Sequence, residues 1–139
     1  MLPPRLSILI IDDDQDDIDL FREAALALDS NIKIDSATSV EEALNFLNKS
    51  SPSPNYIFLD LNMPKMNGKE CIAILKKDPR FKSIPLAVYT TSKLPNDLEQ
   101  SRTRGAEYFI TKPTRLSDLT NAISEVINNL PPPKSNSDH

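Results

Sequence analysis

Acidic side chains follow two short apolar runs of this chain. Residues 8–11 are followed by three successive aspartates that begin at Asp12, and residues 56–59 are followed by Asp60. A carboxylate buried without partners is costly, because it loses its hydration and gains no compensating contact. These acids should therefore lie at the wet tip of a strand or meet cations that make them useful.

Five short runs rich in β-branched or aromatic residues are bounded by turn residues and predict strands. They begin at Ser7, Ile32, Tyr56, Leu86 and Tyr108. Between them, apolar residues recur with the period of a helix. The clearest stripes are Ile18, Phe21, Ala25 and Leu28; Val40, Ala43, Leu44 and Leu47; and Leu119, Ile123, Val126, Ile127 and Leu130. The chain therefore reads as five βα units.

Helix boundaries carry their own signals. Three pairs have capping-box-like spacing, Ser39 with Glu42, Asn67 with Glu70 and Asn96 with Glu99, and Gly105 stands where a helix ends. Strands that alternate with helices and are apolar on both faces predict a doubly wound α/β fold, with a parallel sheet covered on each side.

Ligands of such folds gather beyond the carboxyl ends of the strands. The predicted strands deliver Asp12, Asp13, Asp60, Thr90 and Lys112 to that edge. Two adjacent acids beside a third would repel one another without a cation, so metal binding is favoured for them. The following acids are better explained by the start of a helix, where carboxylates are stabilising; these are Asp14, Asp16 and Asp17.

Length and composition exclude several classes. The 139 residues, 39% of them hydrophobic, suit one domain, expected over residues 6–130 with disordered ends at 1–5 and 131–139. A net charge of −4 argues against nucleic acid. Cys71 and His139 are each single, which excludes cysteine zinc clusters and disfavours His-dependent catalysis. The N-terminus predicts neither a signal peptide nor a membrane span, so a soluble cytoplasmic protein is expected.

Four motifs in order carry a resemblance to a known family. They are "DD" after the first strand, "LDLNMPKMNG" after the third, "TTS" after the fourth and "TKP" after the fifth. Together they resemble the receiver domain of bacterial response regulators, the chemotaxis type, over residues 6–130. "TTS" and "DDDQDD" are also similar to stand-alone receivers that pair with phytochrome-like sensor kinases. The resemblance implies a five-stranded sheet of order 2-1-3-4-5 with five helices.

The resemblance also implies a metal site and a phosphoryl acceptor. Asp60 would accept the phosphoryl group, and Asp13, Asp60 and the backbone carbonyl of Asn62 would hold Mg²⁺, with Asp12 helping through water; Mn²⁺ would substitute. A hard cation with oxygen ligands suits this task, because it screens two anionic groups that must approach each other. Lys112 would supply a second positive charge.

Further positions follow from the same resemblance. Thr90 would donate a hydroxyl hydrogen bond to a phosphoryl oxygen, and Pro113 would follow a cis peptide. Phe109 occupies the place of the family's switch aromatic, without the hydroxyl of a tyrosine. The side chains of Asn62 and Ser92 would flank the path of the water that hydrolyses the phosphoryl group.

The implied function is that of a two-component phosphorelay receiver, with a histidine kinase or histidine phosphotransfer domain as donor. Output would be a protein contact, made by a monomer or a phosphorylation-dependent homodimer, with no membrane or nucleic-acid partner and no ordinary enzymatic activity. A phosphate-independent scaffold with the same fold is the alternative. A haloacid-dehalogenase-type phosphatase would need an acid at position 62, which is Asn62, and a flavodoxin-like binder would not place six aspartates after the first strand.

Overall fold

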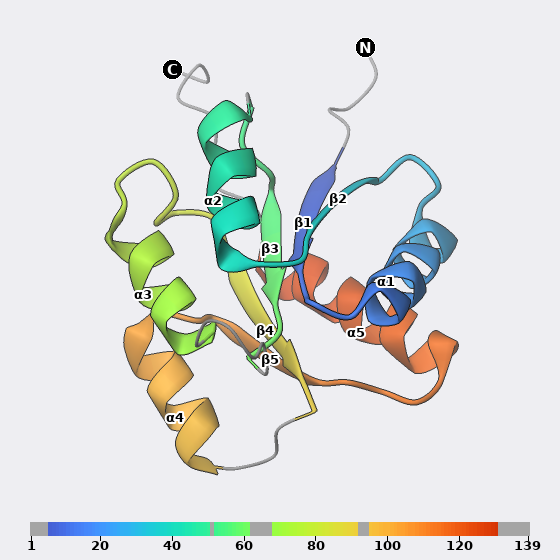
Figure 1. The fold of residues 1–139 in the computed structure, drawn as a ribbon. Coiled ribbons are helices and arrows are strands. Elements are labelled where there is room, and N and C mark those ends of the chain that lie inside the picture. Colours follow the sequence, from blue (N-terminus) through green and yellow to red (C-terminus); the bar gives the residue numbers. More distant parts are fainter. Residues whose placement is uncertain (1–5, 51, 62–67, 92–94, 131–139) are drawn as a thin grey trace.

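The computed structural model describes residues 6–50, 52–61, 68–91 and 95–130, and strands alternate with helices throughout them (Figure 1). The strands are β1 (Ser7–Ile11), β2 (Lys33–Ala37), β3 (Tyr56–Leu59), β4 (Leu86–Thr90) and β5 (Tyr108–Thr111). The helices are α1 (Gln15–Leu28), α2 (Val40–Lys49), α3 (Gly68–Lys77), α4 (Pro95–Arg104) and α5 (Leu116–Asn129). The five predicted βα units are confirmed.

All neighbouring strands pair in parallel, in the order β2-β1-β3-β4-β5. β1 lies between β2 and β3, so Ile11 is level with both Ala37 and Leu59. The predicted doubly wound α/β fold and its strand order are therefore confirmed. Because β1 and β3 are neighbours, the residues that follow them leave the sheet side by side.

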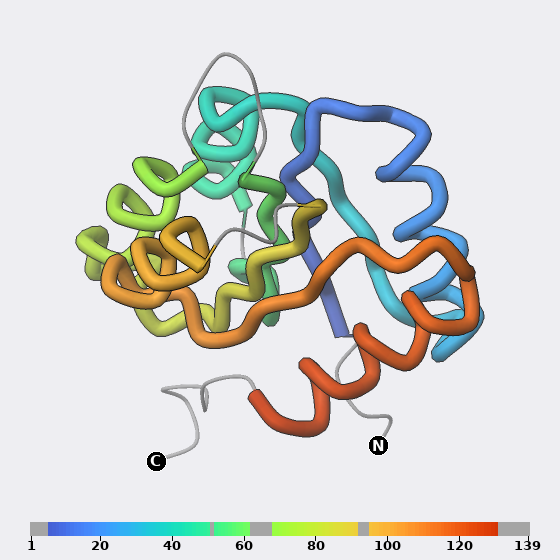
Figure 2. The backbone as a smooth tube through the Cα atoms, turned by 90° about the horizontal axis from the view of Figure 1, so that it is seen from below, coloured from blue at the N-terminus to red at the C-terminus, as the bar shows by residue number. Residues whose placement is uncertain are grey.

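Two apolar layers cover the sheet, one on each face. Helices α2 and α3 pack on one face and α1 and α5 on the other, with α4 beside α3 (Figure 1, Figure 2). Alternate residues of β1 feed the two layers: Leu9 and Ile11 face α2 and α3, whereas Ile8 and Ile10 face α1 and α5. Burial on both faces explains why this strand is continuously apolar rather than alternating.

The helix signals are confirmed in part. Ser39 caps α2, because its Oγ accepts the backbone N–H of Glu42 at 3.0 Å. Gly105 ends α4 with a φ of 119°, a left-handed conformation that glycine adopts without a Cβ clash. The prediction of a cap at Asn96 is wrong, since α4 already begins at Pro95, whose fixed φ suits the first helical position. The Asn67 cap lies outside the described residues.

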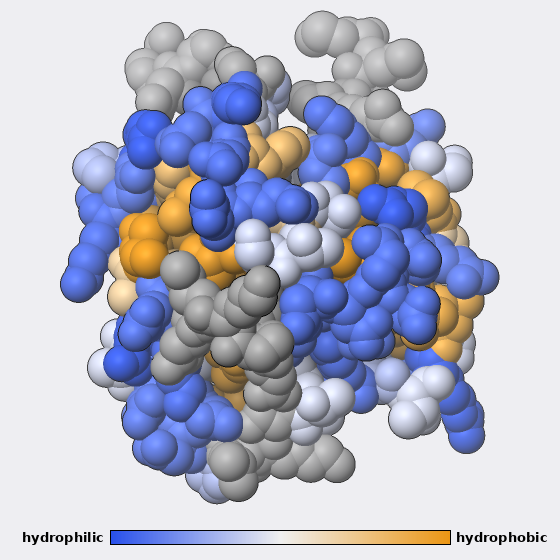
Figure 3. Space-filling view, in the orientation of Figure 1, coloured by the Kyte–Doolittle hydropathy of each residue, from blue (hydrophilic) through white to orange (hydrophobic). Residues whose placement is uncertain are grey.

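Hydrophilic side chains cover most of the face shown in Figure 3, and apolar surface shows between them in separate areas. Among the described residues, the large apolar side chains that are most exposed are Leu20, Leu26, Leu28 and Ile74. No helix in the described ranges has the length and hydrophobicity that crossing a bilayer would require.

Candidate functional site

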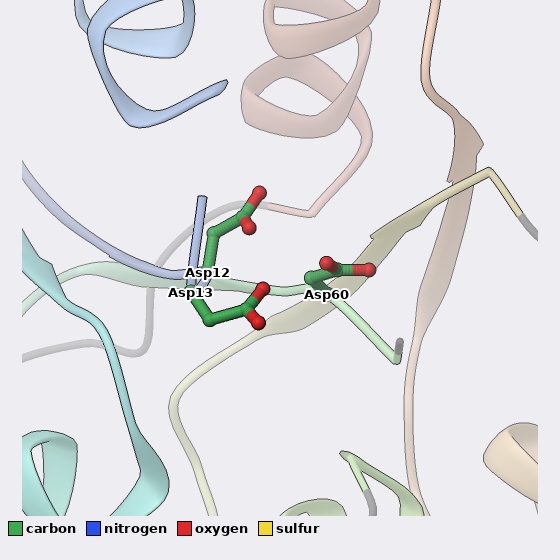
Figure 4. Close-up of side chains that lie close together, drawn as sticks. All are labelled: Asp12, Asp13 and Asp60. Atoms are coloured by element: carbon green, nitrogen blue, oxygen red, sulfur yellow. The ribbon is translucent and has the colours of Figure 1, made fainter. Parts of the chain in front are cut away.

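Three carboxylates meet where β1 and β3 end. The backbone N–H of Asp60 donates to the carbonyl of Ile11 at 2.9 Å, which fixes the tip of β3 against the tip of β1. One oxygen each from Asp12, Asp13 and Asp60 can be chosen so that all three lie within 4.8 Å of one another (Figure 4). The sequence prediction that these acids converge is thus borne out by the geometry.

Two of these carboxylates are buried and one is at the rim. Asp12 has no exposed surface and Asp60 is 4% exposed, whereas Asp13 is exposed. Burial raises the pKa of Asp12 to about 6, and repulsion from Asp60 adds to the rise, although hydrogen bonds from Lys112 and the backbone oppose it. Burial and mutual repulsion make the ionised carboxylates of this cluster unfavourable, and a cation bound there stabilises them.

The ammonium of Lys112 reaches this cluster from the end of β5. Its Nζ lies 2.9 Å from Asp12 Oδ2 and 3.4 Å from Asp60 Oδ2. Burial would lower the pKa of Lys112, but hydrogen bonds to Asp17 and Asp12, together with the negative charges of Asp60 and Asp12, raise the pKa above its ordinary value. Lys112 is therefore a fixed positive charge beside the acids.

Asp17 is a member of the site that sequence reasoning missed. Asp14 caps α1 by accepting the backbone N–H of Asp16 at 2.9 Å, as predicted. Asp17 lies in the same turn, but its Oδ2 also lies 2.7 Å from Lys112 Nζ. The signal was available in the helical period: Asp17 stands four residues before buried Phe21, at the border of the buried face of α1.

Thr90 is brought to the same edge of the sheet. It is buried at the end of β4, and its carbonyl accepts the backbone N–H of Lys112 at 2.9 Å. Leu59 pairs with Val88, so the end of β4 lies beside the tip of β3 that carries Asp60. The expected roles of Asn62 and Ser92 fall outside the described residues.

Aromatic side chains of β4 and β5 lie on both faces of the sheet, and one of them is beside Lys112. The Lys112 Nζ lies 5.0 Å from the ring centroid of Tyr89, and that ring belongs to the α1 and α5 layer. Phe109 packs against the α2 and α3 layer, with the Arg102 guanidinium 5.5 Å from its ring centroid. Tyr108 joins the opposite layer and donates to Glu125 at 3.2 Å, so it faces away from Phe109 as the strand period predicts.

The donor set favours hard divalent cations. Carboxylate oxygens at this spacing suit Mg²⁺ or Mn²⁺, which prefer oxygen ligands. The contact of Lys112 with both Asp12 and Asp60 shows that the cluster already accommodates positive charge. The arrangement can hold an anionic group between cations over the Asp60 carboxylate, which is the requirement of phosphoryl transfer.

The fold and this strand-end cluster define a receiver-type signalling domain. The family model described as "response regulator receiver domain" matches residues 8–124, so the chain belongs to this family. Its function is therefore that of a receiver in a two-component phosphorelay, as the sequence predicted.

Similar proteins include other response regulators. Response regulator Rcp1 of Synechocystis is 34% identical over 122 residues, covering 84% of this chain and 82% of that protein. The crystal structure of the phosphorylated cyanobacterial phytochrome response regulator RcpA superposes with a TM-score of 0.82 at 29% identity, covering 91% of this chain and 94% of that one. The crystal structure of the Mn²⁺-bound form of Rcp1 superposes with a TM-score of 0.78 at 30% identity, covering 94% of this chain and 100% of that one.

Proposed function

We propose that Asp60 is the phosphoryl acceptor of this receiver and that a phosphohistidine of a sensor kinase or phosphotransfer domain is the donor. A carboxylate oxygen of Asp60 attacks phosphorus, the P–N bond breaks, and the imidazole keeps the electron pair. The observation that carries this proposal is the position of Asp60, which lies 3.4 Å from the Lys112 ammonium and close to the carboxylates of Asp12 and Asp13.

The acids are proposed to hold one Mg²⁺, with Mn²⁺ as a substitute. Asp13 and Asp60 supply carboxylate oxygens, Asp12 helps through water, and the carbonyl of Asn62, outside the described residues, is the expected third protein ligand. When bound, the ion supplies positive charge that screens the acceptor carboxylate from the incoming phosphoryl group. Support comes from the spacing of the three acids and from Rcp1, a similar protein whose Mn²⁺-bound form has been solved.

Two further side chains are proposed to bind the phosphoryl oxygens. Lys112 donates charge-assisted hydrogen bonds from its ammonium, and the hydroxyl of Thr90 donates one more. Thr90 ends β4, the neighbour of β3, and Lys112 follows β5, the next strand in the sheet. Such contacts position the group and neutralise its charge, which is most of what catalysis of phosphoryl transfer requires.

The phosphorylated chain is proposed to signal by contact with another protein, as a monomer or a phosphorylation-dependent homodimer, in the cytoplasm. Its chemistry would then be self-catalysed transfer and slow hydrolysis rather than turnover of a substrate. A phytochrome-like kinase is the proposed type of sensor, supported by the likeness to Rcp1 and to the phytochrome response regulator RcpA. The acidic net charge of −4 supports a protein partner over nucleic acid.

Incubation with acetyl phosphate and Mg²⁺, followed by intact mass, tests this proposal. The wild-type chain should gain the mass of one phosphoryl group, and the gain should vanish when EDTA replaces Mg²⁺. Asp60→Asn should remain unmodified while its circular dichroism stays unchanged, because the amide is isosteric but not a nucleophile. Failure of the wild-type chain to gain this mass, despite measurable Mg²⁺ binding, would favour the scaffold alternative.

A further inference from the structure

Among the residues that the structure describes, the Lys112 ammonium has three carboxylate partners, and two of them belong to the metal cluster. Asp12 and Asp60 are needed by a bound cation, whereas Asp17 lies on the first turn of α1, outside the cluster formed by Asp12, Asp13 and Asp60. The contact with Asp17 is also the shortest of the three, at 2.7 Å against 2.9 and 3.4 Å.

We infer that Asp17 is a positioning residue for Lys112, which keeps the ammonium paired at the edge of the site while a divalent cation takes the other acids. This inference rests on the proposed function of the same site. The contact that Asp17 makes at the site is with Lys112, so we expect it to act through Lys112.

Competition between the two cations explains why such a partner matters. A divalent ion at Asp12 and Asp60 competes with the Lys112 ammonium, which already contacts the Oδ2 atoms of both acids. An ammonium that loses these partners while only 10% exposed would have neither adequate hydration nor a partner of opposite charge. Asp17, whose side chain is 30% exposed, gives it a partner that stays in place. The exchange of cations then leaves every charge compensated.

The ring of Tyr89 limits where the ammonium can go. Lys112 Nζ lies 5.0 Å from its centroid, and the ring is fixed by edge contact with Phe21 of α1 at 5.7 Å. A cation is attracted to the face of such a ring. If the ammonium loses Asp12, its contact with Asp17 keeps it against α1, near the expected phosphoryl position, and prevents its release to solvent.

The affinity for Mg²⁺, measured without any phosphoryl donor by calorimetry, tests this inference. Asp17→Asn should weaken Mg²⁺ binding by about three- to tenfold, because Lys112 then depends on the two acids that the metal needs. Asp16→Asn is the matched control: it removes the same charge from the same exposed turn, and it should change the affinity by less than about twofold.

A double-mutant cycle separates positioning from a general effect of charge. In a Lys112→Ala background, Asp17→Asn should change the affinity for Mg²⁺ no more than Asp16→Asn does. In the otherwise wild-type chain, Asp17→Glu keeps the carboxylate and should retain most of the affinity that Asp17→Asn loses. An Asp17→Asn effect of equal size with and without Lys112, or equal effects at positions 16 and 17, would overturn the inference. Thermal midpoints of all variants in EDTA report any loss of folding.

The outcomes also distinguish this inference from the proposed function. If the wild-type chain binds Mg²⁺ and becomes phosphorylated but shows no coupling between positions 17 and 112, only the positioning role of Asp17 is wrong. If the wild-type chain binds no Mg²⁺, the proposed function itself fails.

Discussion

The ammonium of Lys112 lies 2.9 Å from the Oδ2 of Asp12, a fully buried carboxylate 100 positions earlier in the chain. Each charge stabilises the other, because each has lost most of its hydration. This ion pair therefore links the residues that follow β1 and β5, and a divalent cation at the site competes with it.

Replacement of Lys112 by alanine should have opposite effects on stability and on metal binding. The metal-free protein should lose about 2 kcal/mol of unfolding free energy, since Asp12 and Asp60 are left uncompensated. The affinity for Mg²⁺ should stay the same or rise, because a competing cation is gone. Urea unfolding in EDTA and calorimetric titration check the two effects, and no tryptophan is present to serve as a fluorescent probe.

Lys82→Ala is the control for this experiment. Lys82 is exposed, and its substitution changes the net charge equally. It should alter neither quantity by much. Loss of Mg²⁺ binding in Lys112→Ala, with binding intact in Lys82→Ala, would contradict the account of two competing cations.

The two glycines of the chain should respond differently to alanine. A Cβ at Gly68 would lie 2.8 Å from the Cα of Leu61 and 2.9 Å from the carbonyl oxygen of Asp60. Because these are backbone atoms, Gly68→Ala should displace the tip of β3. We expect a loss of about 1–3 kcal/mol in stability together with Mg²⁺ binding at least about threefold weaker.

Gly105→Ala provides the comparison, because it lies at the other end of the strands. A residue with a φ of 119° is strained by any Cβ, and this Cβ would also meet Lys76 Cγ at 2.7 Å. The variant should lose about 1–2 kcal/mol of stability but bind Mg²⁺ as the wild type does. Equal Mg²⁺ affinities for both variants would show that Gly68 does not position Asp60.

The thiol of Cys71 should be inert in the folded chain. It is fully buried, and burial raises its pKa to about 12 from an ordinary value of 9.0. Because the folded state then holds the proton more tightly, the thiol's contribution to stability is intact below pH 9 and is lost between about pH 9 and 12. Each unit in that window should cost up to about 1.4 kcal/mol.

Thiol labelling and alkaline unfolding check this prediction. At pH 8 a disulfide reagent should label Cys71 only when the chain is denatured. The stability difference between wild type and Cys71→Ala should shift in favour of the variant as pH rises from 8 to 10. Rapid labelling of the native protein would contradict the buried assignment.

The lifetime of the phosphoryl group should depend on bulk near the water path. Asn62 and Ser92 are short and uncharged, and both lie outside the described residues. Ser92→Tyr should crowd an in-line water and slow hydrolysis by roughly tenfold, which corresponds to about 1.4 kcal/mol in the barrier. Decay of phosphorylated protein, followed by mass after the donor is removed, measures this; an unchanged rate would show that Ser92 does not flank that path.

The strand ends were predictable from the sequence because short apolar runs stop at polar residues. Asp12, Asp60 and Lys112 each follow such a run, and the parallel sheet then brings them together. The pattern placed them at one edge of a parallel sheet, whereas the strand order that makes β1 and β3 neighbours followed from the family resemblance.

The contacts of the first helical turn were harder to predict. Asp14, Asp16 and Asp17 all suit a helix N-terminus, and composition does not separate them. The rotation of α1 about its axis, set by burial of Ile18 and Phe21, decides that Asp17 faces Lys112. The start of α4 was missed for a related reason, since proline at the first position competes with asparagine at the cap.

The most direct test of the central claim identifies the phosphorylated atom in the wild-type chain. Phosphorylation with acetyl phosphate and Mg²⁺, reduction of the acyl phosphate with borohydride, and peptide mass analysis mark the acceptor as an alcohol. The account predicts that this mark is at Asp60 alone and that it disappears when the donor is omitted. A mark at Asp12 or Asp13, or an unmarked chain that nonetheless binds Mg²⁺, would contradict it.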